Sequence, residues 1–140
     1  DVKPANILLE SGIERVKLTD FGLAQKMNDD DRSRNRFIVG TPLYMAPEQF
    51  RGERNDPRSD LYSAGAVLYH MLAGQPPYGG NIFRFLVGDK AITLEALPEE
   101  VSEIAEVVYK SLDHNPANRY QSAEEMWRAL GDVLAPAYSY

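Results

Sequence analysis

SDLYSAGAVLYHMLAGQPP, residues 59–77, contains the longest mostly apolar run of the sequence. Ser59 and Asp60 can cap a helix over residues 61–73 that is apolar on nearly every side. Gly74 is a typical helix stop, and two prolines follow it closely. Because a helix that is apolar all round must be covered by other elements, we expect this one at the centre of a domain.

The sequence after this helix has the spacing of further helices. The first is predicted by apolar residues at helical intervals, namely Val101, Ile104, Ala105, Val108 and Leu112. Ser122 and Glu125 form a capping box before a second apolar stripe, made of Met126, Leu130, Val133 and Leu134. One more short helix is predicted within residues 81–88. The C-terminal half is therefore expected to be helical.

Before the central helix the chain is strand-like and then irregular. Residues 7–10 and 15–19 are short β-prone runs with Gly12 between them, so Ile7 to Thr19 predicts a hairpin. From Asp20 to about Met45 there is no periodicity, and the middle of this stretch is dense in charge. The predicted fold is α+β and predominantly α-helical, with a hairpin and a long exposed loop docked on a helical body.

Composition limits the classes of protein to consider. With 140 residues, of which 44% are hydrophobic and 26% charged, the chain is expected to form one globular domain. A net charge of −6 without a basic stripe argues against nucleic acid or an anionic membrane as the main partner. The absence of cysteine excludes disulfides and cysteine-based zinc sites, and it fits a reducing compartment.

The sequence has no feature of a membrane anchor or an export signal. Its longest apolar run is too short and too polar to span a bilayer, and its N-terminus lacks the layout of a secretory signal. We expect a cytoplasmic segment without membrane contact, with any membrane tether outside it. Because the chain has no initiator methionine, we also expect a fragment of a longer protein.

Five short motifs follow one another along the chain. They are DVKPAN at 1–6, DFG at 20–22, GTPLYMAPE at 40–48, SDLYSAG at 59–65 and NPANRY at 115–120. In this order they resemble the catalytic loop, the metal-binding turn, the end of the activation segment and the helical body of the eukaryotic-type protein kinases. Each motif alone is weak, but five in the family's order are specific. The bacterial members of that family look most similar.

This resemblance spans nearly the whole chain and implies the C-terminal lobe of a kinase. Residues 1–140 would run from the catalytic loop to the last helix, with the hairpin carrying the catalytic and metal-binding loops. The chain contains no G-x-G-x-x-G motif, which the family carries in its N-terminal lobe. The implied domain is therefore partial, and its first partner is the missing N-terminal lobe of the same natural chain.

The resemblance implies a role for the polar residues of the first two motifs. Asp1 would orient the attacking hydroxyl and accept its proton, and Lys3 would offset charge on the transferred phosphate. Asn6 and Asp20 would supply oxygen ligands to Mg²⁺. These residue types suit the reaction, because transfer of the ATP γ-phosphoryl group spreads negative charge over oxygens. Taken one at a time, the same residues also fit ordinary turn and cap roles.

The acceptor type is also implied. Lys3, Gly40 and Thr41 match the serine/threonine branch of the family, so the implied substrate is a protein with a Ser or Thr acceptor. Thr41 would shape the substrate pocket, and its alternative is a turn hydroxyl. Ser33 lies between arginines in the long loop, where a phosphate would gain charged partners and could act as a switch. The alternative for Ser33 is a solvated linker serine.

Three residues of the helical body are implied to support the site. Glu48 and Arg119 match a pair that is a buried ion pair in the family and ties the activation segment to the helices; the alternative is two unrelated surface charges. Asp60 would fasten the catalytic loop from the central helix, and a plain helix N-cap is its alternative. Outside the motifs, we interpret Trp127 as a packing residue.

Three hypotheses about function follow. The first is a serine/threonine protein kinase that uses ATP and Mg²⁺, with these residues alone inactive because they lack the phosphate-gripping lobe. The second is a pseudokinase or docking module that binds partners without catalysis, and the polar residues of the first two motifs argue against it. The third is a helical domain unrelated to kinases, in which Glu48 and Arg119 would lie far apart.

Overall fold

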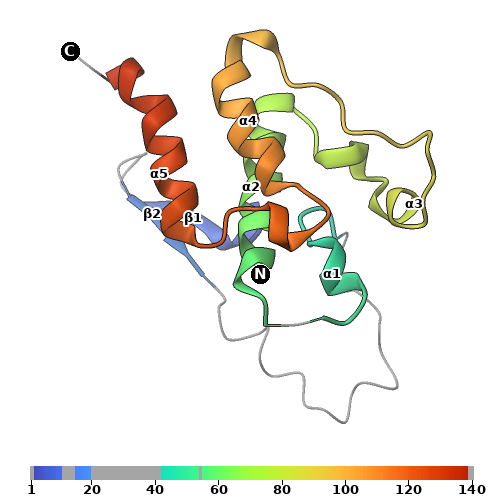
Figure 1. Ribbon diagram of the computed structural model, residues 1–140. Coiled ribbons are helices and arrows are strands. Elements are labelled where there is room, and N and C mark those ends of the chain that lie inside the picture. The colour runs from blue at the N-terminus through green and yellow to red at the C-terminus, as the bar shows by residue number, and fades with distance from the viewer. Residues whose placement is uncertain (1, 11–14, 20–41, 54, 139–140) are drawn as a thin grey trace.

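A computed structural model describes residues 2–10, 15–19, 42–53 and 55–138 (Figure 1). Its regular elements are β1 (Ile7–Glu10), β2 (Arg15–Leu18), α1 (Pro47–Phe50), α2 (Pro57–Ala73), α3 (Ile82–Leu86), α4 (Ser102–Ser111) and α5 (Ala123–Leu134). Short 3₁₀ turns lie at Pro4–Asn6, Pro77–Gly80, Glu99–Val101, Pro116–Asn118 and Ala135–Tyr138. This mostly helical arrangement with one small antiparallel sheet confirms the predicted fold class. Within these ranges no helix is both long and apolar enough to cross a membrane.

The predicted hairpin is present. β1 and β2 pair antiparallel in the register that places Ile7 opposite Leu18. The hairpin exposes several large apolar side chains, namely Leu8, Leu9, Val16 and Leu18. Because a two-stranded sheet buries little surface by itself, backbone pairing sets its register more than packing does.

α2 begins a turn earlier than the sequence pattern predicts. The N-cap is Asp56, whose carboxylate accepts a hydrogen bond from the Arg58 N–H at 2.9 Å. Pro57 occupies the first helical position, where its fixed φ suits the helix and its missing N–H costs nothing. This Asp-Pro pair therefore starts the helix before Ser59 and Asp60. The predicted cap at Ser59 and Asp60 is wrong, since both lie within the first turn.

The end of α2 and its central position are as predicted. Gly74 has a φ of 77°, and its N–H donates to the His70 carbonyl at 2.9 Å. Figure 1 shows α4 lying along α2. The main core lies between them and consists of Ala46, Tyr62, Ala66, Tyr69, Leu97, Ala105, Val108 and Leu112.

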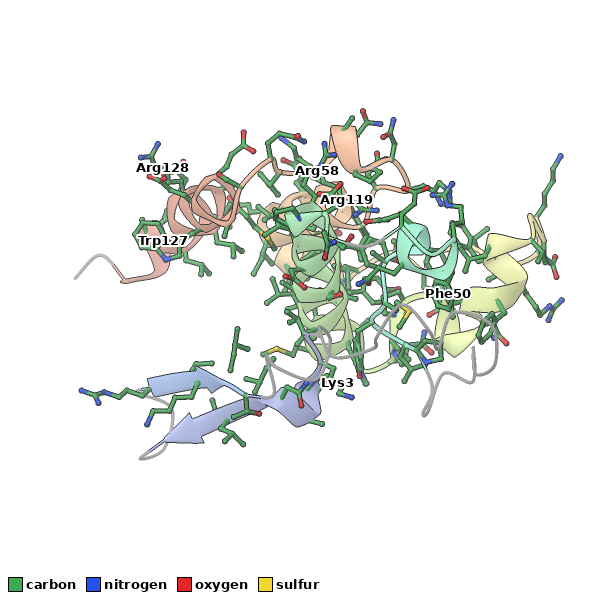
Figure 2. The ribbon with its side chains drawn as sticks, turned by 90° about the horizontal axis from the view of Figure 1, so that it is seen from below. Lys3, Phe50, Arg58, Arg119, Trp127 and Arg128 are labelled. Atoms are coloured by element: carbon green, nitrogen blue, oxygen red, sulfur yellow. The ribbon has the colours of Figure 1, made fainter. Side chains whose placement is uncertain are left out.

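α5 packs through a narrower face than its sequence predicts. A second buried cluster joins α5 to α2 and α4 and consists of Leu61, Val107, Tyr120 and Met126. Leu134, the last residue of the predicted stripe, is 39% exposed. Trp127 is 72% exposed, so its predicted packing role is wrong (Figure 2). Successive helical residues lie about 100° apart around the axis, and Trp127 consequently points away from the face that buries Met126.

The short helix predicted within residues 81–88 is present as α3. The ring of Phe83 meets that of Phe50 in α1 edge-on, with 5.3 Å between the ring centroids. On the other side of α3, Phe85 stacks on Tyr78 at 4.0 Å. Aromatic contacts therefore join α3 to α1 and to the turn that follows α2.

Candidate functional site

The structure describes the predicted site residues Lys3, Asn6, Glu48, Asp60 and Arg119. The others, Asp1, Asp20, Ser33 and Thr41, lie outside the described residues, together with most of the predicted long loop. Their roles stay predictions. The described residues form two groups: Lys3 and Asn6 at the base of the hairpin, and the other three around the first turn of α2.

Asn6 is held in place at the base of the hairpin. It ends the 3₁₀ turn that Pro4 begins, and its N–H donates to the Lys3 carbonyl at 2.9 Å. Its own carbonyl accepts the Thr19 N–H at 2.8 Å and the Thr19 hydroxyl at 3.4 Å. Asn6 is only 4% exposed. The first motif is thus paired with the residue that directly precedes Asp20 in the sequence.

The chemistry of this junction fits half of a magnesium site. The side-chain amide oxygen of Asn6 is a hard donor of the kind that Mg²⁺ accepts. The described ranges contain no group of three or more His, Cys, Asp or Glu side chains that could hold a metal ion. The predicted second ligand, Asp20, follows Thr19 outside those ranges. The role of Asn6 as a metal ligand stays a prediction, and the structure shows only its position at the base of the hairpin.

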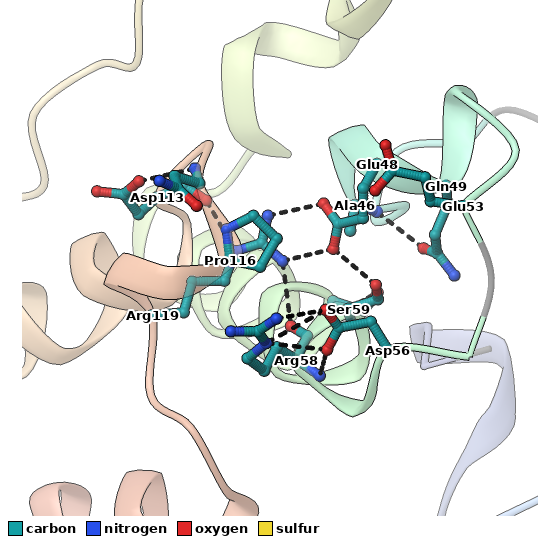
Figure 3. Close-up of polar contacts among 12 residues, drawn as sticks. Ala46, Glu48, Gln49, Glu53, Asp56, Arg58, Ser59, Asp113, Pro116 and Arg119 are labelled. Carbon is teal, nitrogen blue, oxygen red and sulfur yellow. Dashed lines mark hydrogen bonds and ion pairs between the residues drawn. The ribbon is translucent and has the colours of Figure 1, made fainter.

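The structure brings Glu48 and Arg119 together in a buried ion pair (Figure 3). Arg119 Nη1 lies 2.6 Å from Glu48 Oε1, and Nη2 lies 2.8 Å from Oε2. The two residues are 1% and 2% exposed, respectively. They are not unrelated surface charges. The pair connects α1, at the end of the third motif, to the turn before α5.

Arg119 uses all five of its N–H donors. Beside the two bonds to Glu48, Nε donates to the Asp113 carbonyl at 2.7 Å. The remaining two donate to the carbonyls of Arg58 at 3.2 Å and His114 at 3.4 Å. The guanidinium also lies over the Tyr62 ring, 4.9 Å from its centroid. A buried guanidinium with every donor paired meets the condition for a stable buried charge.

Ser59 is a member of this network that sequence reasoning missed. Its hydroxyl donates to Glu48 Oε1 at 2.6 Å from the first turn of α2. Burial raises the pKa of Glu48, but the hydrogen bonds from Arg119 and Ser59 outweigh burial and hold that pKa below its usual value. The SD dipeptide of the fourth motif is the only signal for this contact in the sequence, and it fits a helix cap equally well. Asp60 directly follows Ser59 in the same turn.

A second ion pair stands at the start of α2. Arg58 binds both carboxylate oxygens of Asp56, with contacts of 2.8 to 3.2 Å, and this hydrogen bonding lowers the pKa of Asp56. Arg58 Nη1 also donates to Gln121 Oε1 at 2.9 Å. The start of α2 is therefore tied to the residues just before α5.

Residues 42–50, called segment 42–50 below, are hydrogen-bonded to α2 near both of its ends. Near one end, the Tyr44 hydroxyl and His70 Nδ1 share a hydrogen bond of 2.7 Å, and their rings are stacked. Burial raises the pKa of Tyr44. Near the other end, Glu48 accepts from Ser59. Because His70 lies in the last turns of α2 and Ser59 in the first, the segment is held along most of the helix.

Comparison with known proteins identifies the family. A family model described as protein kinase domain matches residues 1–129. The chain belongs to the protein kinase family. This confirms the resemblance drawn from the five motifs and excludes an unrelated helical domain.

The curated relatives of this kinase sequence include serine/threonine kinases from bacteria. It is 43% identical over 133 residues to serine/threonine-protein kinase PknB of Mycobacterium tuberculosis, which covers 90% of this chain and 21% of that protein. A probable serine/threonine-protein kinase of Clostridium perfringens is 36% identical over 139 residues, covering 95% of this chain and 20% of that protein. A probable PknB of Corynebacterium glutamicum is 34% identical over 151 residues, covering 100% and 23%. The chain spans about a fifth of the length of these relatives.

Proposed function

We propose that this chain is the C-terminal part of a serine/threonine protein kinase domain that transfers the ATP γ-phosphoryl group to Ser or Thr hydroxyls of protein substrates. The observation that carries the proposal is the pairing of Asn6 with Thr19. Asn6 is the last residue of the first motif, and Thr19 directly precedes Asp20, the first residue of the second motif. In a kinase these two motifs supply the catalytic and metal-binding groups. The serine/threonine kinases among the curated relatives support the acceptor type.

The working residues come from the first two motifs. Asp1 would orient the acceptor hydroxyl and take its proton, and Lys3 would offset charge beside the same phosphate. Asn6 and Asp20 would hold Mg²⁺ through oxygen atoms. When bound, Mg²⁺ neutralises charge on the phosphate oxygens and ATP supplies the transferred group.

The remaining predicted residues act around this centre. Thr41 would shape the pocket that receives the substrate Ser or Thr, and Ser33 is the proposed phosphorylation site in the long loop. Glu48 and Arg119 would keep segment 42–50 on the helical body, and Asp60 would fasten the catalytic loop from α2. The activity is placed in the cytoplasm, where ATP is available, with any membrane tether outside these residues.

The 140 residues alone are proposed to be inactive. They contain no G-x-G-x-x-G loop, so the ATP phosphates would be held only through the metal at Asn6 and Asp20. Their first partner is the N-terminal lobe of the same protein, which would supply the remaining phosphate contacts. The test of catalysis must therefore use the full-length natural protein.

The deciding experiment is phosphate transfer from labelled ATP to a mixed protein substrate by the full-length protein. We expect label on Ser and Thr, and a loss of about 100-fold or more in Asp20→Asn, which removes the charge facing the metal. The matched control is Asp30→Asn, the same change in the charge-dense stretch of sequence, which should keep activity. A wild-type protein that binds ATP without transferring phosphate would favour the pseudokinase or docking alternative.

A further inference from the structure

Ser59 occupies an unusual place for a small polar residue. It lies in the first turn of α2, is 4% exposed, and its hydroxyl is 2.6 Å from Glu48 Oε1 (Figure 3). A hydroxyl that only caps a helix would face the backbone N–H groups of its own turn. Ser59 instead donates a hydrogen bond to a carboxylate from another element. Its backbone carbonyl accepts a hydrogen bond from the Ser63 hydroxyl at 3.2 Å.

The carboxylate of Glu48 is held from two directions. Oε1 accepts from both Ser59 and Arg119 Nη1, while Oε2 accepts from Arg119 Nη2. Arg119 is itself fixed by the backbone carbonyls of Asp113, Arg58 and His114, so it holds the carboxylate from the turn before α5. Ser59 holds the same carboxylate from α2, through a short side chain with few rotamers. The hydrogen bond from Ser59 is therefore the direct side-chain contact that orients the carboxylate relative to the first turn of α2.

We propose that Ser59 is a positioning residue: its hydroxyl fixes the orientation of the Glu48 carboxylate that Arg119 binds, and so holds segment 42–50 on the first turn of α2. The neighbouring Asp60 is the residue proposed to fasten the catalytic loop. Two consecutive residues of one helical turn would thus position two segments that the reaction needs: Ser59 would hold segment 42–50, and Asp60 would hold the catalytic loop. This consequence for activity rests on the proposed kinase function, whereas the positioning itself does not.

The charges around Glu48 determine how the proposal can be tested. Arg119 is the cation that binds Glu48, and Arg58, which binds Asp56, is a second cation near enough to interact with its charge. Tyr62 is a neutral neighbour whose pKa is raised by burial. Because the folded state holds the pKa of Glu48 below its unfolded value, the ionised carboxylate stabilises the fold at neutral pH. That stabilisation is lost as pH falls through the folded pKa. Removing the Ser59 donor raises the folded pKa, so the loss should begin at a higher pH.

The test compares Ser59→Thr with Ser59→Val in the full-length protein. These two side chains have nearly the same shape, and only Thr keeps the hydroxyl. Acid unfolding is followed by circular dichroism, and Ser59→Ala is measured beside wild type. We expect the acid midpoint of Ser59→Val and Ser59→Ala to rise by about half a pH unit, while Ser59→Thr stays near wild type.

Ser63→Ala is the matched control. It removes another buried hydroxyl of α2, 5% exposed, which donates only to its own helix backbone in the described contacts. We expect its loss of unfolding free energy in urea to be the same at neutral and acid pH, whereas the loss in Ser59→Val should shrink as Glu48 becomes protonated. Equal acid midpoints for Ser59→Thr and Ser59→Val would overturn the proposal, as would a loss in Ser59→Val that does not change with pH. A Ser59→Val protein that is unfolded at every pH, beside a folded Ser59→Thr, would support it.

Kinase activity gives the second arm. Ser59→Val should lose about tenfold in kcat/KM at neutral pH, and Ser59→Thr should recover most of it. Full activity in a folded Ser59→Val would overturn the link to catalysis. If wild type transfers no phosphate, the proposed function fails, and the acid midpoints still decide whether Ser59 positions Glu48.

Discussion

Gly65 of α2 faces Ser111 of α4 so closely that a Cβ atom at residue 65 would lie 2.5 Å from the Ser111 Cβ atom. Real Cβ contacts are longer, so the two helices can approach this closely only with glycine at this position. The packing of α4 on α2 forms much of the main core.

Gly65→Ala should therefore destabilise the protein, although alanine is the better helix former. Overpacking at a close helix contact costs about 1–3 kcal/mol, which exceeds the roughly 1 kcal/mol that alanine gains in propensity. Urea unfolding of the full-length protein measures the change. Gly131→Ala in α5 is the control, because nothing lies within 4 Å of its Cβ position, and it should be neutral or stabilising. Adding Ser111→Gly to Gly65→Ala should recover part of the loss; a simple sum of both losses would contradict this account.

Arg119→Met should be among the most destabilising single changes. It leaves the Glu48 carboxylate buried without its cation, which costs about 3–5 kcal/mol. The same change at Arg128 is the control, because the pair of Arg128 with Glu124 has 70% of both side chains exposed and is worth at most about 1 kcal/mol. Thermal unfolding distinguishes the two. Similar losses in both variants would show that burial of the Glu48 pair has little effect.

Asp56→Ala should cost about 1 kcal/mol, because it removes the side chain that caps α2. Asp56→Asn should cost less, since an asparagine side chain can still accept the Arg58 N–H. Urea unfolding at neutral pH separates the cap from the charge. If both variants lose equally, the ion pair with Arg58 matters more than the cap.

Tyr78 should ionise late in alkaline solution. It is 9% exposed, and burial raises its pKa to about 12, above the value of about 10 expected in the unfolded chain. The neutral phenol therefore stabilises the fold fully below about pH 10, and this contribution is lost as pH rises toward 12. The difference in phenolate absorbance between wild type and Tyr78→Phe should show one group titrating near pH 12. In strong denaturant the same difference should move to about pH 10; a native titration near 10 would contradict the buried position.

Local signals in the sequence predicted most elements and the family. The hairpin over 7–19, the helix stop at Gly74, the short helix within 81–88 and the two amphipathic helices all follow from turn residues and apolar spacing over a few neighbouring positions. The five motifs were enough to indicate a protein kinase, which the family comparison confirmed. The predicted start of α2 is wrong because two possible N-caps lie about one turn apart, Asp56 and the Ser59-Asp60 pair. Asp56 is the stronger cap because Pro57 follows it at the first helical position.

Tertiary structure decided which polar residues are buried and what they bind. Nothing near Ser59 in the sequence indicates that its hydroxyl meets Glu48, and Glu48 lies 71 positions from Arg119. Trp127 is exposed because α5 turns only a narrow face to α2 and α4, which its own apolar pattern does not specify. Short-range spacing sets the local backbone, because the forces involved act between neighbours. Which side chains are buried, and which hydrogen-bond partners they find, depends on elements far apart in the chain. Both are therefore decided only when the helices pack.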